Sequence, residues 1–220
     1  MTNRNWPPSR QYSKSEVLAD GAVHAVGLAL AIIAGAVLLF LGAGRAAAGE
    51  YATLVIYVLA LVTVMSISFA YNHWPPTPVK AFLRRFDHSA IYLLIAATYT
   101  PFAIQLADQR LAAGVLAVVW LGAAAGIAMK LFMPGRYDRV AIGLYLLIGW
   151  SGATVFGPLV DVLPPTSLWL IVAGGIAYSS GVIFYALHRM KFQTALWHAF
   201  VVLGAGLHMA AVTGMVAWRV

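Results

Sequence analysis

The sequence predicts an all-α integral membrane protein, a seven-transmembrane helix bundle with a cytoplasmic N-terminus and an external C-terminus. Of its 220 residues, 62% are hydrophobic and 10% are charged, and the mean hydropathy is +0.84. A soluble domain usually carries about 25% charged residues. The apolar residues also fall into runs of membrane length, and the positive charges alternate between the loops that separate them. These three observations favour a chain that crosses a bilayer repeatedly.

The apolar runs define the expected spans, because about 20 apolar residues cross the hydrocarbon core of a membrane. The runs lie at 20–44, 51–73, 88–107, 111–130, 140–158, 166–187 and 194–217. Pro75, Pro76 and Pro78 end the second run, since proline cannot continue a helix. The loops are short, so residues 20–220 are expected to form one transmembrane domain behind a cytoplasmic segment at 1–19.

Lysine and arginine set the expected orientation. Most of them fall in the N-terminal segment and in the loops after the second, fourth and sixth runs: Arg4, Arg10, Lys14, Lys80, Arg84, Arg85, Lys130, Arg136, Arg139, Arg189 and Lys191. Arg45, Arg110 and Arg219 lie on the other side. Cytoplasmic loops hold the excess of positive charge, which predicts a cytoplasmic N-terminus and an odd number of spans.

Composition also restricts partners and cofactors. The net charge is +7, but the basic residues form short clusters between apolar runs and no single stripe, so membrane lipids and not nucleic acid are the expected partners. The oligomeric state stays open. The chain has no cysteine, which excludes disulfides and thiolate metal sites. The N-terminus has no apolar core of a signal peptide, which favours a bacterial inner (plasma) membrane protein with no cleaved leader.

Polar side chains gather at the predicted cytoplasmic ends of four spans, where ionisable groups are candidates for function. They are Glu16, Asp20 and His24 in the first, Ser68, Asn72 and His73 in the second, Asp87 and His88 in the third, and Thr194 and His198 in the seventh. The spacing of four places Glu16, Asp20 and His24 on one helix face. His198 lies one turn inside an apolar run, which favours function. His208, about 15 Å further along the helix, is expected near mid-membrane, where it also lines the polar site.

Structural roles compete with these interpretations. Ser13 and Glu16 fit a capping box at the start of the first helix. Asp87 fits a cap at the start of the third helix, where its charge would also meet the positive end of the helix dipole. His24 and His208 fit interior histidines that are hydrogen-bonded to backbone or hydroxyl groups of neighbouring helices.

Several ordered motifs extend over nearly the whole chain. They are Glu16 with His24 to Gly27, Ser68 to Tyr71, Arg85 to His88, Tyr99 to Phe102, Gly174 to Tyr178 with Gly181 and Tyr185, and Trp197 to Val201 with His208. In this order they resemble the bacterial hemolysin III family, within the larger progestin and adipoQ receptor superfamily. The resemblance implies a seven-helix bundle with a cytoplasmic N-terminus, in agreement with the charge distribution.

The resemblance also implies a zinc site. In metal-binding members of the superfamily, zinc is held near the cytoplasmic side by one histidine on the second helix and two on the seventh. An aspartate at the start of the third helix contacts the metal through water. Ser68, Asp87 and His198 match this pattern, whereas Asn72 and Thr194 stand where two of the three histidines are expected.

Other histidines are candidates to replace the missing ligands, namely His73, His24 and His88. His73 is adjacent to Asn72, but one residue turns a side chain by about 100° around a helix. We therefore expect His73 to take the place of Asn72 only if the helix unwinds before Trp74.

Three functions remain open. The first is a hemolysin III-type protein of membrane or lipid homeostasis, whose polar His/Asp cluster binds an ion or a lipid headgroup or carries protons. The second is a zinc-dependent hydrolase of lipid amides, with Asp87 as proton acceptor and Ser68 orienting Asp87 or the oxyanion. The third is pore formation, which is least supported, because so many cytoplasmic-side charges are typical of a resident membrane protein.

Overall fold

A computed structural model of the chain describes residues 12–187 and 189–218, and this part contains helices and connecting turns without strands. The helices are α1 (Lys14–Ala43), α2 (Ala48–His73), α3 (Pro78–Ala103), α4 (Gln109–Phe132), α5 (Asp138–Trp150), η1 (Ser151–Val155), α6 (Phe156–Val160), α7 (Pro165–Ala186) and α8 (Gln193–Ala217). Each predicted apolar run corresponds to one of these helices or, for the fifth, to α5, η1 and α6 together. Arg4, Arg10 and Arg219 lie outside the described residues.

Six stretches of the described chain are long and apolar enough to cross a membrane, which confirms the prediction of a multi-span, all-helical protein. They are α1, α2, α4, Val140–Val160, α7 and α8. α3 is not among them, because its first half carries charged side chains and its second half contains Tyr99, Thr100 and Pro101.

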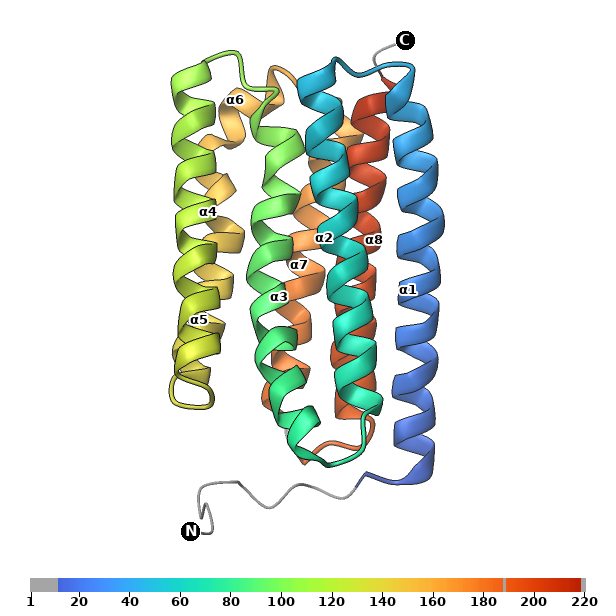
Figure 1. Cartoon of the computed structure of the whole chain (residues 1–220). Coiled ribbons are helices and arrows are strands. Elements are labelled where there is room, and N and C mark those ends of the chain that lie inside the picture. The colour runs from blue at the N-terminus through green and yellow to red at the C-terminus, as the bar shows by residue number, and fades with distance from the viewer. Residues whose placement is uncertain (1–11, 188, 219–220) are drawn as a thin grey trace.

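α3 lies inside the bundle, which explains why it is less apolar than its neighbours. α1 packs against α2 and α8, α3 packs against α2 and α4, and α7 packs against α8. Figure 1 shows these helices side by side, with the first turn of α1 and the last turn of α8 at opposite ends of the bundle. Tyr92, Ala96 and Ala97 of α3 are fully buried. Because protein and not lipid covers much of α3, its polar side chains find protein partners.

α1 begins at Lys14, ahead of the predicted start at residue 20, because a capping box closes its first turn. The Ser13 hydroxyl accepts a hydrogen bond from the Glu16 backbone amide, and the Glu16 carboxylate accepts one from the Ser13 amide. The capping interpretation of Glu16 is thus confirmed. The corresponding interpretation of Asp87 is wrong, because α3 begins at Pro78 and Asp87 lies well inside it.

The helix of the fifth predicted span is interrupted in its middle, and Tyr99 of α3 forms hydrogen bonds with the backbone on both sides of the interruption. The helix changes to a 3₁₀ turn at Ser151, where Gly149 and Gly152 lower its stability as a helix. The Tyr99 hydroxyl donates to the Gly149 carbonyl at 2.6 Å and accepts from the Gly152 amide at 2.7 Å. Unpaired backbone groups are costly at membrane depth, so Tyr99 makes this irregular backbone tolerable.

A three-residue ion-pair network ties α3, α4 and α5 together at the end of the bundle where α1 begins. The Asp138 carboxylate accepts from Lys130 Nζ at 2.6 Å and from Arg84 Nη2 at 3.2 Å. Lys130 is 4% exposed. In the sequence, Lys130 and Arg84 indicate only which side of the membrane their loops face. The structure gives both side chains a specific carboxylate partner.

Candidate metal centre

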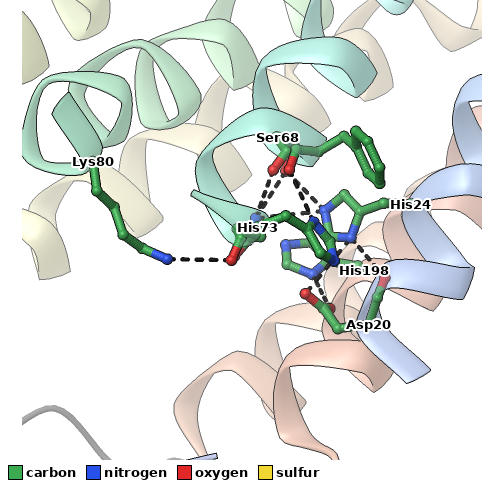
Figure 2. Close-up of polar contacts among 8 residues, drawn as sticks. Asp20, His24, Ser68, His73, Lys80 and His198 are labelled. Carbon is green, nitrogen blue, oxygen red and sulfur yellow. Dashed lines mark hydrogen bonds and ion pairs between the residues drawn. The ribbon is translucent and has the colours of Figure 1, made fainter. Parts of the chain in front are cut away.

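Asp20, His24 and His198 form a compact buried cluster between α1 and α8. One potential ligand atom from each residue lies within 4.8 Å of the others. His198 Nδ1 lies 2.7 Å from Asp20 Oδ1, and the two imidazole rings are 4.2 Å apart between centroids. Figure 2 shows His24 and His198 facing one another from the two helices, with the Asp20 carboxylate beside them. We call these three residues the Asp/His/His cluster.

α2 completes the surroundings of His24. Its Nδ1 lies 2.8 Å from the Asp20 carbonyl oxygen one turn earlier in α1, so Nδ1 carries the proton and donates it. Nε2 then accepts, and its neighbours are the Ser68 hydroxyl at 3.2 Å and the Asn72 amide nitrogen at 3.4 Å. Asn72, which stands where the resemblance implies a histidine, therefore still points at the cluster.

His73 lies on the outer side of His24 without any unwinding of α2, which continues through His73. The two rings are 5.5 Å apart in an edge-to-face arrangement, and His73 Nδ1 donates to the Phe69 carbonyl at 2.9 Å. Lys80 Nζ donates to the carbonyls of Asn72 and Trp74 at 3.2 and 3.0 Å and so caps the end of α2. Figure 2 shows Lys80 reaching toward this end of the helix. Because α2 does not unwind before Trp74, His73 does not take the place of Asn72 in this structure, and it lies outside the compact group of Asp20, His24 and His198.

Of the other predicted residues, some lie around the cluster and some apart from it. Asp87 lines the same cavities as His198, and Thr194 lines the polar one. Glu16 bridges to the start of α8, since its Oε1 accepts from the Phe192 amide at 3.0 Å. His88 Nε2 lies 4.0 Å from Asp87 Oδ2, on the side of α3 near Tyr71.

His208 is far from the cluster and packs into a notch on α7. Its Nε2 donates to the Ile171 carbonyl at 3.1 Å. A side chain at Gly174 would place Cβ 2.3 Å from the His208 ring, so the notch requires glycine. The interpretation of His208 as an interior histidine bonded to backbone fits this geometry, although its buried Nδ1 has no hydrogen-bond partner among the described residues.

Two cavities meet at the cluster. A polar cavity of about 320 Å³ contains Asp20, His73, Lys80, Arg84 and His88 at the basic end of the bundle. An apolar cavity of about 150 Å³ continues along the bundle between α2, α3, α5, α7 and α8 toward His208. Asp87 and His198 line both cavities. A molecule with a polar end and an apolar chain would therefore meet the cluster where its two parts join.

Asp20 is the member of the cluster that sequence reasoning placed only as a lining residue. Its spacing of four from His24 was a usable signal, because i and i+4 side chains lie together on a helix. Its pairing with His198 depends on how α1 packs against α8, which the spacing alone does not reveal.

The fold and this site define a membrane protein with a buried Asp/His/His group, and comparison with known proteins gives its family. The model of the family described as Haemolysin-III related matches residues 13–209. The chain belongs to this family, as the motifs predicted. Together with the six candidate spans, this makes it an integral membrane protein and supports the plasma membrane as its location.

Relatives in bacteria and animals align with most of the chain. Hemolysin-3 of Bacillus cereus is 32% identical over 197 residues, which cover 90% of this chain and 90% of the relative. The Hemolysin-3 homolog of Bacillus subtilis (strain 168) is 32% identical over 194 residues, covering 88% and 91%. Monocyte to macrophage differentiation factor of Homo sapiens is 28% identical over 169 residues, covering 74% and 70%. No solved structure gives a significant match.

Proposed function

We propose that the Asp/His/His cluster binds a divalent cation, zinc, and that the protein uses this site in membrane or lipid homeostasis. The observation that carries the proposal is the convergence of two imidazoles and one carboxylate within 4.8 Å in a buried position. Buried charges are costly unless they are paired or coordinate a metal. The Asp20 carboxylate and the two imidazoles must therefore either bond to one another or share a bound cation.

The donor set fits zinc. Zinc prefers histidine nitrogen and accepts carboxylate oxygen, and two histidines with one carboxylate form a known class of zinc site that keeps a coordination position open. Calcium and magnesium favour oxygen-rich shells, which a cluster with two imidazoles does not offer. The apolar cavity beside the cluster supports a lipid as the molecule that would approach the open position.

We also propose that α3 crosses the membrane, which gives seven spans with the N-terminus in the cytoplasm. Its 26 residues extend for about 39 Å at 1.5 Å per residue, longer than the hydrocarbon core of about 30 Å. Lys80, Lys130 and Asp138 gather at one end of the bundle, where the loops after α2 and α4 lie (Figure 1). The excess of positive charge at that end supports its assignment to the cytoplasm.

The wild-type protein, purified mildly with zinc supplied, is expected to hold close to one zinc per chain. Elemental mass spectrometry of the dialysed protein measures this ratio directly. A chain that retains no metal under these conditions would contradict the proposed cation site and leave the cluster as a hydrogen-bonded network.

A second candidate function is hydrolysis of a lipid amide, favoured by the position of Asp87 and Ser68 beside His24 and His198 at the head of the apolar cavity. A bound zinc ion supplies Lewis acidity for attack by water on a carbonyl. Asp87 would accept the proton of that water, Ser68 would orient Asp87 or the oxyanion, and the apolar cavity would hold the acyl chain.

Hydrolysis is tested with a fluorescent ceramide as the lipid amide, in nanodiscs that contain the zinc-loaded protein. Release of the fatty acid is expected for wild type and to fall by about 100-fold or more in Asp87→Asn, since a positioned proton acceptor contributes roughly 10²–10⁴-fold. Asp161→Asn makes the same exchange at an exposed carboxylate outside both cavities, so it is the matched control and should keep the activity. Equal rates for wild type and Asp87→Asn would exclude this function.

A further inference from the structure

Three imidazoles lie in or beside the Asp/His/His cluster, and the Nδ1 atom of each faces a protein oxygen. The Nδ1 atoms of His24, His73 and His198 lie against the Asp20 carbonyl at 2.8 Å, the Phe69 carbonyl at 2.9 Å and the Asp20 carboxylate at 2.7 Å. A carbonyl or carboxylate oxygen accepts, so each Nδ1 carries the proton and each Nε2 carries the lone pair. Histidines that bind metals commonly donate their other ring N–H to such an oxygen.

His73 lies next to the His24 ring but outside the compact group. It is exposed, whereas His24 and His198 are buried. Its ring centroid is 5.5 Å from that of His24, and the His24 and His198 centroids are 4.2 Å apart. Lys80 caps the carbonyls on either side of His73, so the backbone there is fixed. To come closer to His24 and His198, the His73 side chain would have to rotate and give up its bond to the Phe69 carbonyl.

Gly21 makes this approach possible. A Cβ on Gly21 would lie 2.8 Å from His73 Nε2, which means that the imidazole rests directly on the backbone of α1. Gly21 lies between Asp20 and His24 in that helix. The lone pair of His73 is thus directed at the turn of α1 that carries the cluster, and a side chain on Gly21 would push the ring away.

We infer that His73 is the third imidazole of the metal site and binds the cation through Nε2 together with His24 and His198, while Asp20 orients His198. This inference rests on the proposed cation site and assigns roles within it. It restores three imidazoles to a chain in which Asn72 and Thr194 occupy two of the expected ligand positions. His73 also lines the polar cavity at the basic end of the bundle, and it is the exposed one of the three imidazoles.

The test is a metal titration of the purified full-length protein after chelation. Co²⁺ binding is followed by visible absorption, and the zinc dissociation constant is measured by competition with a chromophoric chelator. His73→Ala is expected to weaken zinc binding by at least tenfold, since even partners outside the ligand set change affinity by roughly 10–100-fold. It should also reduce the Co²⁺ absorption that reports the imidazole ligands.

Two further variants make the test specific. Gly21→Ala keeps every histidine but displaces the His73 ring, so it should weaken zinc binding in the same direction. His88→Ala removes an imidazole from the same polar cavity and should bind as wild type does. Size-exclusion profiles and thermal unfolding in detergent show whether each variant is folded.

The outcomes separate this inference from the cation site itself. Zinc binding that is unchanged in His73→Ala but lost in His198→Ala would overturn the role of His73 and leave the cation site intact. An equal loss of zinc affinity in His73→Ala and His88→Ala would also overturn it. The loss would then come from removing any imidazole from the polar cavity and not from removing a metal ligand. A wild type that binds neither metal would overturn both.

Discussion

Replacement of His198 by alanine is expected to abolish stoichiometric metal binding while the helix bundle remains folded. His198 is the residue that joins α8 to the cluster on α1, through its 2.7 Å contact with Asp20. Its loss removes one imidazole ligand and leaves the other two groups on α1 alone. We expect the zinc dissociation constant to rise by on the order of 100-fold or more, beyond the effect of an outer-shell partner.

The same change should also lower stability modestly. Asp20 is buried, and without His198 its carboxylate loses a charge-assisted hydrogen bond, which costs about 1–3 kcal/mol. His208→Ala is the matched control, because it removes a histidine from the same helix that lies outside the cluster. Elemental mass spectrometry should find zinc in the control and little in His198→Ala. Equal zinc contents in the two variants would show that the cluster is not the site.

Asp138→Asn is expected to destabilise the protein most among the substitutions outside the cluster. Lys130 is buried and has its 2.6 Å contact with Asp138. Removing one partner of a buried ion pair costs about 3–5 kcal/mol. We expect about 3 kcal/mol, the lower end, because the Asp138 side chain itself is 33% exposed. Thermal unfolding in detergent measures the loss, with exposed Asp161→Asn at the other end of the bundle as control.

The effect of Asp138 should depend on pH in a defined direction. Burial alone would raise the pKa of this carboxyl, but the hydrogen bond and charge of Lys130, with the charge of Arg84, outweigh burial and lower the pKa below 3.8. A lowered folded-state pKa gives stability at neutral pH that is lost as the pH falls through that pKa. The difference in Tm between wild type and Asp138→Asn should therefore shrink below about pH 4. A difference that stays constant into acid would contradict the ion-pair explanation.

Much of the fold follows from the sequence, because a segment that crosses the bilayer must be long, apolar and hydrogen-bonded within its own backbone. Every predicted apolar run forms mostly helix in the described chain, although the third run was expected to reach residue 107 and α3 ends at Ala103. The proline-rich loop ends α2 after His73 as expected. The break after Trp150 was not predicted. It depends on the Tyr99 hydroxyl of α3, and a contact between distant segments leaves no local pattern.

The sequence predicted the residues that line the candidate site but not which of them contact one another. The spacing of Glu16, Asp20 and His24 indicated a polar face, and the position of His198 inside an apolar helix indicated function. Which of these groups meet depends on helix packing, which brings Asp20 to His198 and leaves His88 apart. Asn72 retains contact with His24 even though it cannot supply an imidazole.

The structure also changes how the basic residues are understood. The sequence offered Lys130 and Arg84 as topology signals only, because loop charges near span ends usually have that role. Burial of Lys130 beside Asp138 shows that a residue counted as a topology signal also holds two helices together. No periodic pattern distinguishes these two roles in advance.

The central claim is that the Asp/His/His cluster is a metal site, and X-ray absorption at the zinc edge of the purified wild-type protein tests it most directly. The claim predicts a shell of nitrogen and oxygen atoms at about 2.0–2.1 Å with the outer-shell scattering of at least two imidazoles, and loss of that imidazole signal in His198→Ala. A shell of oxygen atoms without imidazole scattering, or a spectrum unchanged in His198→Ala, would contradict it.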